Sequence, residues 1–231
     1  MNTQNVLLLS AGLVNLIMSI IVFSRGIKNK INLYFGLLAL FNFIWVISLA
    51  IGRLSNVDML WYYGGALLAY PAALGIAVFL FYFCFYFPVQ NKNSSPLKNF
   101  FIIFPAIILS VVVFIEDVFI LSYDKNIVNT EYTLYVNKPL YIIYAVYFVV
   151  IIILALRELY SKIKISENLF KKQIVILFIA VLIGLIFGVY YNLVLCYFAN
   201  YHYNWFGPVF TLFMNLVVFF FLISPKEKIH G

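Results

Sequence analysis

Charged residues are scarce in this sequence. Of its 231 residues, 10% are Asp, Glu, Lys or Arg and 65% are hydrophobic, whereas soluble domains are roughly a quarter charged and half apolar. This deficit excludes a soluble domain and indicates an integral membrane protein. Because each spanning helix needs about 20 apolar residues, the length accommodates six to eight spans and no sizeable soluble domain. We therefore expect a single membrane domain over residues 1–231.

The motifs of common catalytic and cofactor sites are also missing. The sequence has no GxSxG elbow, no HExxH, no paired His and acid at metal-ligand spacing and no glycine-rich phosphate loop. The last apolar run, TLFMNLVVFFFLIS, has no lysine, which excludes a microbial rhodopsin with its retinal Schiff base. We therefore expect no enzyme activity, no catalytic residue, no metal site and no cofactor.

What the sequence does have is a series of long apolar runs. Polar breaks such as RGIKNK, PVQNKNSSPLKN and RELYSKIKISENLFKK separate them. The alternation of a membrane β-barrel is absent, so helix is the expected state. We predict an all-α fold, a bundle of seven transmembrane helices. The spans are placed near 5–24, 31–52, 60–87, 99–121, 139–157, 173–198 and 204–223.

The basic residues set the predicted orientation. With the N-terminus outside, 12 of the 15 Lys and Arg residues fall in inner segments. The positive-inside rule then gives an outer N-terminus and an inner C-terminus in a multi-pass protein of the plasma membrane. The net charge of +7 is a topology signal that also attracts anionic inner-leaflet lipid. We expect no nucleic-acid partner, because the basic residues lie in short loops against the membrane.

Two predicted spans carry small residues at four-residue steps. In lipid, helices associate largely through close approach at small residues and through interhelical hydrogen bonds. We therefore predict a packing contact between the third and sixth spans, with separate contacts to other helices as the alternative. The small residues are Gly65, Ala69, Ala73 and Ala77 in the third span and Ala180, Gly184 and Gly188 in the sixth.

Polar residues inside the apolar runs are few. Asn15 and Asn42 fall near the middle of the first two spans, and we expect them to hydrogen-bond to each other and support helix packing. A functional role for the pair is the alternative.

A second group of polar and aromatic residues falls at the predicted outer ends of the spans. Asn192 continues the ladder of the sixth span to the outer interface. We predict that it closes one wall of a ligand pocket, because such pockets are mostly apolar with a few converging polar groups. The alternatives are solvated acids at a helix end and an aromatic belt. The predicted ligand-binding residues are Arg53, Glu116, Asp117, Tyr190, Asn192, His202 and Trp205.

Several segments together resemble a known family. They are NLYFGLLALFNFIWVISLAI, then YPAALGIAVFLFYFCFYFP before a polar loop, LFKKQIVILFIAVLIG and NWFGPVFTLFMNL, with scattered Trp45, Pro71, Pro88, Gln173, Gly207 and Pro208. The arrangement is similar to the seven-helix N-terminal sensor region of bacterial histidine kinases. This resemblance implies an outer N-terminus, an inner C-terminus and a signal passed from the membrane bundle to a cytoplasmic module.

The sequence departs from that family at its end. It stops at SPKEKIHG, without a signalling helix, a PAS domain, a phosphoacceptor histidine or an ATP-binding domain. We therefore expect either an excised sensor region or a stand-alone relative that acts through a partner. The expected partners are the lipid bilayer and a cytoplasmic signalling protein or fused kinase module, and homodimer formation stays open.

These observations predict a membrane sensory or receptor-like domain that detects a ligand or membrane state from the outer face. A small transporter or channel subunit is the alternative, and it requires a polar path that continues to the inner side. An assembly subunit of a larger membrane complex is a third option.

Overall fold

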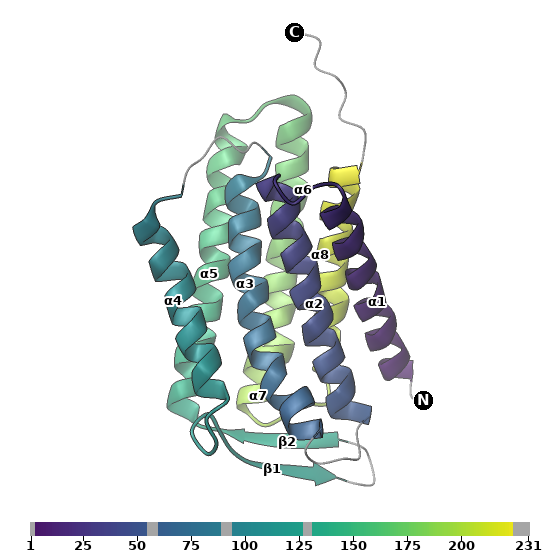
Figure 1. The fold of residues 1–231 in the computed structure, drawn as a ribbon, viewed down its shortest axis with the longest axis vertical. Helices are drawn as coiled ribbons and strands as arrows, with labels where there is room; N and C mark the ends of the chain where they lie inside the picture. Colours follow the sequence, from purple (N-terminus) through teal and green to yellow (C-terminus); the bar gives the residue numbers. More distant parts are fainter. Residues whose placement is uncertain (1–2, 55–59, 89–93, 127–130, 224–231) are drawn as a thin grey trace.

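A computed structural model describes residues 3–54, 60–88, 94–126 and 131–223. Within these ranges the chain forms a bundle of long helices with a two-stranded sheet across one end (Figure 1). The helices are α1 (Thr3–Ser24), α2 (Lys30–Leu54), α3 (Leu68–Tyr86), α4 (Pro96–Val113), α5 (Lys138–Ile165), α6 (Asn168–Val189), α7 (Leu195–Tyr197) and α8 (Phe206–Ile223). Two π-helical segments, η1 (Leu60–Leu67) and η2 (Tyr190–Val194), extend α3 and α6.

The helices follow the predicted spans in order. Six of them are long and apolar enough to cross a membrane, and α8 is a shorter apolar helix over Phe206–Leu222. In Figure 1 the N-terminal end of α1 lies at the same end of the bundle as the sheet, and α8 ends at the other. We call these the hairpin end and the opposite end.

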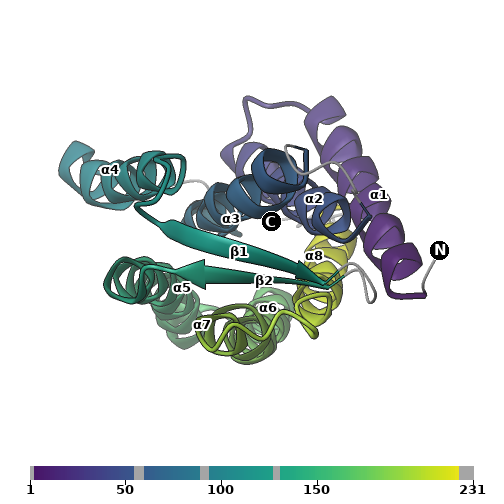
Figure 2. The ribbon, with the colours of Figure 1, turned by 90° about the horizontal axis from the view of Figure 1, so that it is seen from below.

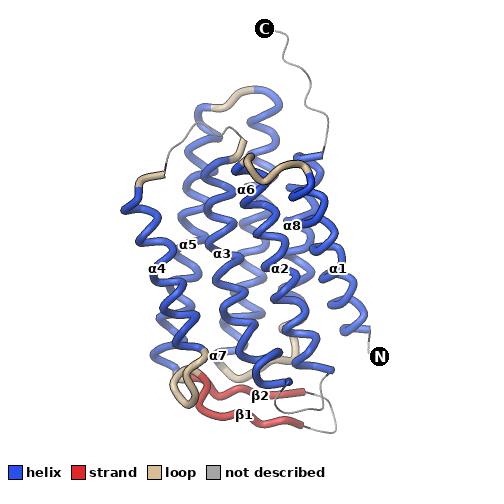
Figure 3. The backbone as a smooth tube through the Cα atoms, in the orientation of Figure 1, coloured by secondary structure: helices blue, strands red, loops and turns tan. Residues whose placement is uncertain are grey.

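The prediction of an all-α fold is wrong at the hairpin end. The fourth helix, expected over 99–121, ends at Val113, and the chain then forms the antiparallel strands β1 (Ile120–Asn126) and β2 (Glu131–Val136) (Figure 3). The run FIEDVFIL is apolar apart from Glu116 and Asp117, and apolar density without a clear period does not separate a strand from a helix. Asn137 then accepts a hydrogen bond from the Leu140 amide and starts α5.

The hairpin covers the end of the bundle with apolar side chains. Phe119, Ile120, Leu134 and Val136 are buried against the helices, whereas Leu121 is exposed. Figure 2, seen from this end, shows both strands lying across the helix ends. The hairpin therefore closes the hairpin end of the bundle.

Five helices form a closed ring. α2 packs on α3, α3 on α5, α5 on α6, α6 on α8, and α8 returns to α2. α1 lies outside the ring against α2 and α8, and α4 lies outside against α3 (Figure 2). The interior enclosed by α2, α3, α5, α6 and α8 is where any central site must lie.

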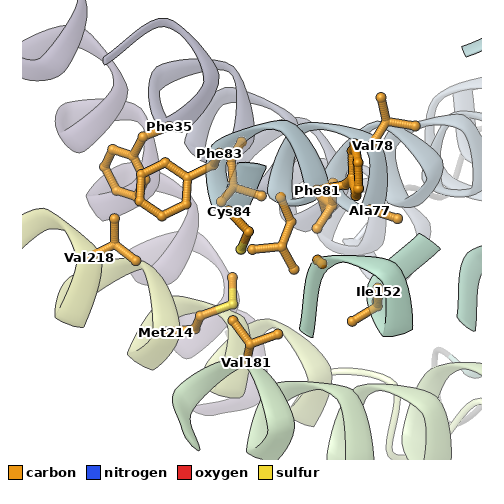
Figure 4. Packing of buried hydrophobic residues seen from close by; sticks show 14 of the residues in the cluster. Phe35, Ala77, Val78, Phe81, Phe83, Cys84, Ile152, Val181, Met214 and Val218 are labelled. Atoms are coloured by element: carbon orange, nitrogen blue, oxygen red, sulfur yellow. The ribbon is translucent and has the colours of Figure 1, made fainter. Parts of the chain in front are cut away.

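The opposite half of this interior is close-packed. Figure 4 shows Phe83 of α3 beside Phe35 of α2, and their ring centroids are 5.7 Å apart. Both Cys84 and Cys196 are free and buried. Every residue from Leu80 to Phe87 is buried, so α3 ends inside a dense aromatic core.

Lys162 of α5 holds the C-terminal end of α3. Its buried ammonium group donates to the carbonyl oxygens of Cys84 at 2.6 Å and Phe85 at 2.8 Å, and also to that of Phe87. A positive charge is favourable at a helix C-terminus, where carbonyls lack helical partners. This contact fixes α3 to α5 at the opposite end.

The central asparagines pair differently from the prediction. Asn15 and Asn42 are both buried, but the Asn15 side chain accepts its interhelical hydrogen bond from Asn215 Nδ2 of α8 at 2.7 Å. Asn42 instead donates to the Leu38 carbonyl of its own helix. The expected Asn15–Asn42 bond is therefore replaced by a link from α1 to α8, because α8 packs against α1 inside the bundle.

Candidate functional site

A cavity of about 90 Å³ lies inside the ring of helices, toward the hairpin end. Its walls come from α2, α3, α5, α6 and α8, and Leu134 of β2 covers it. Protein interiors are normally packed as densely as organic crystals. Open space of this size in the middle of a bundle is therefore a feature that needs a physical explanation.

The small residues of α6 border this cavity instead of a helix contact. A Cβ atom added at Gly184 or Gly188 would meet no atom within 4 Å, and both residues line the cavity. Ala69 and Ala73 of α3 line it from across the ring. The two ladders face the same space, but the predicted close approach of the third and sixth spans does not occur there.

Close packing of small residues is found elsewhere. A Cβ at Gly65 would lie 2.6 Å from the Cα of Gly52, so η1 packs backbone to backbone on α2. The inner members of the two ladders, Ala77 and Ala180, are buried in the core. Gly65 thus makes the contact predicted for small residues, but with the second span.

Two tyrosines of α5 bond to backbone carbonyls of η2 and α3 beside the cavity. The Tyr141 hydroxyl donates to the carbonyl oxygens of Asn192 at 3.3 Å and Leu193 at 3.1 Å, both in η2. The Tyr144 hydroxyl donates to the Tyr70 carbonyl at 3.0 Å. π-helical turns are rare and occur often at functional sites. Here Tyr141 holds the π-helical segment η2, and Tyr144 holds the first turn of α3.

Asn192 lies in η2 and lines the cavity. Its amide fits against Gly207 at the start of α8, where an added Cβ would come within 1.8 Å of Asn192 Nδ2. The buried Nδ2 atom has no hydrogen-bond partner among the described residues. Only glycine at 207 leaves room for this amide.

The hairpin end of the cavity is polar. Tyr201 and Asn204 line it, and the Tyr201 hydroxyl donates to the Leu134 carbonyl at 3.4 Å. Burial raises the pKa of Tyr201 well above its usual value, so this hydroxyl stays protonated as a donor. Arg53 lies behind Asn204 and donates to its Oδ1 at 3.4 Å.

Arg53 is a structural link as well. Its guanidinium donates to the Asn5 side chain at 3.1 Å and to the Gln4 side chain, both in the first turns of α1. The residue therefore ties α1 and α2 to the segment that holds Asn204. It reaches the cavity through Asn204 and does not line it.

The other predicted site residues lie elsewhere. Glu116 and Asp117 are exposed in the turn after α4, where Glu116 accepts a hydrogen bond from Tyr63 at 3.0 Å. Tyr190 and His202 are exposed as well. Trp205 stacks on Phe206 at 3.9 Å between ring centroids and packs against the core. Of the seven predicted residues, all within the described part of the chain, Asn192 is the one that lines the cavity.

Sequence reasoning missed most of the cavity wall. Trp45, Tyr70, Tyr144, Tyr201 and Asn204 line it but were not predicted. Tyrosines within spans 60–87 and 139–157 were an available signal, since a buried hydroxyl needs a partner.

The chemistry of the cavity is uncharged. Its lining contains no Asp, Glu, Lys, Arg or His, and the described residues hold no group of three or more His, Cys, Asp or Glu side chains that could bind a metal ion. The site therefore suits binding of a neutral molecule through shape, apolar contact and a few hydrogen bonds.

Comparison with known proteins identified one family. A family model described as the N-terminal seven-transmembrane region of histidine kinase matches residues 7–224. The comparison with curated proteins and the comparison with solved structures each gave no match.

Proposed function

Because this chain belongs to the family of N-terminal seven-transmembrane regions of histidine kinases, we propose that its central cavity is the ligand site of a membrane sensor. The chain is a multi-pass membrane protein whose family is a sensory region of histidine kinases. The proposal adds that a ligand enters from the outer face or the bilayer, and that the chain itself catalyses no reaction.

The cavity carries this proposal. It lies between α3 and α6 at their glycine- and alanine-rich turns, where helices lack the contacts that fix them elsewhere. A ligand that fills this space gives both helices a partner. Such a ligand shifts the arrangement only if it binds one arrangement better than another, and a cavity that changes volume supplies that difference.

The relay that we propose runs through α8. This helix packs on α6 beside the cavity and on α1 and α2, so a change at α6 reaches it directly. At the opposite end Arg25 donates to the Leu222 carbonyl at 3.0 Å, which couples the end of α8 to the turn after α1. We propose that this end faces the cytoplasm and biases a fused or associated kinase module.

The orientation and setting are part of the proposal. The distribution of basic residues supports an outer N-terminus and hairpin and an inner C-terminus, in the plasma membrane. The proposal leaves homodimer formation open.

The packing of the opposite half favours sensing over transport. Transport requires a polar path from the cavity to the inner side, but the interior beyond Ile76 and Leu80 is filled by the buried aromatic residues of α3 among the described elements. This supports a site without a polar path to the inner side.

The decisive experiment fills the cavity without a ligand. Gly184→Leu should extend into open space and hold the bundle in one signalling state, so phosphorylation by the kinase module in cells should become independent of the stimulus. Ile186→Phe on the outward face of the same helix, at 57% exposure, is the matched control and should signal normally. If both variants respond like the wild type, the cavity is not the sensory site.

The orientation has its own test. Single cysteines introduced at residues 158–167 should be labelled from the cytoplasmic side, and those at residues 121–124 of β1 from outside. Labelling of the 158–167 segment from outside would reverse the proposed direction of signalling.

A further inference from the structure

The cavity is long and narrow. Its lining runs from Gly65 to Leu80 on η1 and α3 and from Val181 to Cys196 on α6, η2 and α7. Each stretch is about 22 Å at a rise of 1.5 Å per residue. A volume of about 90 Å³ spread along this length is a slot, and it has no room for a compact globular molecule.

The two ends of the slot differ in chemistry. At the hairpin end the walls include Asn192, Tyr201 and Asn204, whereas Leu80, Ile152 and Met214 line the opposite end. This gradient matches a molecule with one polar end and an apolar body. The slot would therefore bind such a molecule in one orientation.

The absence of charge in the lining restricts the polar end. A charged group moved from water into an apolar site costs far more than a neutral polar group unless it is paired. No described residue that lines the slot carries a charge that could pair with it. The Asn192 amide, whose Nδ2 has no partner, can donate to or accept from a neutral group such as a hydroxyl.

We propose that the slot binds one extended hydrocarbon chain of an uncharged amphiphile, with its polar group beside Asn192 and its chain directed toward Leu80 and Met214. This inference rests on the proposed sensory role of the cavity and adds the chemical class of its ligand. Recognition comes from the fit of a single chain into the space that the small residues of α3 and α6 leave between these helices, and from hydrogen bonding at the hairpin end.

Trp45 provides a direct readout, because its buried side chain lines the slot. Trp45 lies beside Asn192, since a Cβ added at Gly207 would meet both side chains, and the whole chain in lipid nanodiscs is therefore titrated with 2-bromododecan-1-ol, whose bromine lies next to the hydroxyl and quenches indole fluorescence on contact. We expect quenching that saturates, that unlabelled dodecanol reverses and that Trp45→Phe removes. Quenching that never saturates, or that survives Trp45→Phe unchanged, would mean partition into the bilayer and would overturn the proposal.

Variants then test the shape and the polar end. Gly184→Leu should weaken binding of the bromoalcohol at least tenfold, while Ile186→Phe should leave the affinity for the bromoalcohol unchanged. Asn192→Leu should weaken binding of the bromoalcohol but not binding of bromododecane, which has no polar group. Equal binding of the alcohol to wild type and Gly184→Leu would show that the slot is not the site.

Probes of the same length test the charge. Dodecanoic acid and dodecylamine should displace the bromoalcohol only at concentrations at least tenfold higher than dodecanol requires, and a compact adamantanol should not displace it. An acid or amine that binds as tightly as the alcohol would refute an uncharged ligand. If Gly184→Leu changes kinase output but no chain alcohol binds, the sensory role stands and this ligand class fails.

Discussion

The two halves of α3 are built in different ways. Toward the hairpin end the helix begins as a π-helix and presents Ala69 and Ala73 to an open slot. Toward the opposite end every residue from Leu80 to Phe87 is buried, and Lys162 holds the last carbonyl groups. One half of the helix is fixed by contacts and the other is left with space. A sensor needs both, since a response at a loose site moves a distant element only through a rigid connection.

The largest expected effect is at the fixed end. Lys162→Met removes the donor to three carbonyl groups of the α3 terminus and leaves them buried, at a cost of roughly 3 kcal/mol in the free energy of unfolding. Thermal unfolding in detergent measures this loss. Lys164→Met, an exposed position on the same helix, should stay within about 0.5 kcal/mol. If both lysines are equally dispensable, the opposite end is not fixed in this way.

A pair of glycines separates contact from space within the hairpin half. Gly65→Ala places a Cβ 2.6 Å from the Gly52 backbone and should destabilise the bundle by about 1–3 kcal/mol. Gly184→Ala meets nothing within 4 Å and should be neutral or stabilising by up to about 1 kcal/mol, because alanine is the better helix former. The midpoint of thermal unfolding of each variant measures these changes. A lower midpoint for Gly184→Ala than for Gly65→Ala would contradict the distinction between the two positions.

The hydrogen bond between Asn15 and Asn215 is expected to contribute less to the free energy of unfolding. A double-mutant cycle of Asn15→Leu and Asn215→Leu should give a coupling of about 0.6–2 kcal/mol, the range for interhelical hydrogen bonds in lipid. The same cycle on Asn15 and Asn42 should give no coupling, because these two side chains share no hydrogen bond. Coupling in the second pair and none in the first would place the α1–α8 link elsewhere.

The smallest effect is expected on the surface of the hairpin end. Glu116→Gln and Asp117→Asn change exposed side chains outside the slot, so each should alter stability by less than about 0.5 kcal/mol and leave bromoalcohol affinity unchanged. A tenfold loss of affinity in either variant would restore these acids to the ligand site.

The sequence was sufficient for the helices but not for what lies between them. Apolar runs and polar breaks predicted the seven spans because hydrocarbon imposes helix on a spanning chain. The strands at 120–126 and 131–136 were missed because apolar residues such as Val118 and Phe119 resume the apolar run after the two acids without continuing the helix.

The site was predicted only in part for a similar reason. Small residues such as Gly184 and Gly188 form the same pattern whether they meet another helix or border a void, and only the placement of α3 across the ring separates the two cases. Asn192 was found because an amide at the end of that ladder is unusual. The partner of Asn15 depends on which helix closes the ring, and neither spacing nor composition contains that information.

The π-helical segments have a consequence for the phase of these helices. In an α-helix, residues four apart are separated by about 400°, so a four-residue ladder drifts by about 40° at each step. Gly184, Gly188, Asn192 and Cys196 would therefore wind away from one face by about 120° over three steps. All four nevertheless line the slot, because the wider turn of η2 at 190–194 takes up the drift.

α3 shows both behaviours in succession. Gly65, Ala69 and Ala73 stay in phase where the chain leaves η1, and Ala77, one step farther into regular helix, has turned out of the slot while Ile76 and Leu80 have turned in. Three successive four-residue steps that stay on one face of a membrane helix thus indicate a π-turn. Deleting Tyr190 from η2 would restore the α-helical phase and rotate Asn192 relative to Gly184 without substituting any other side chain.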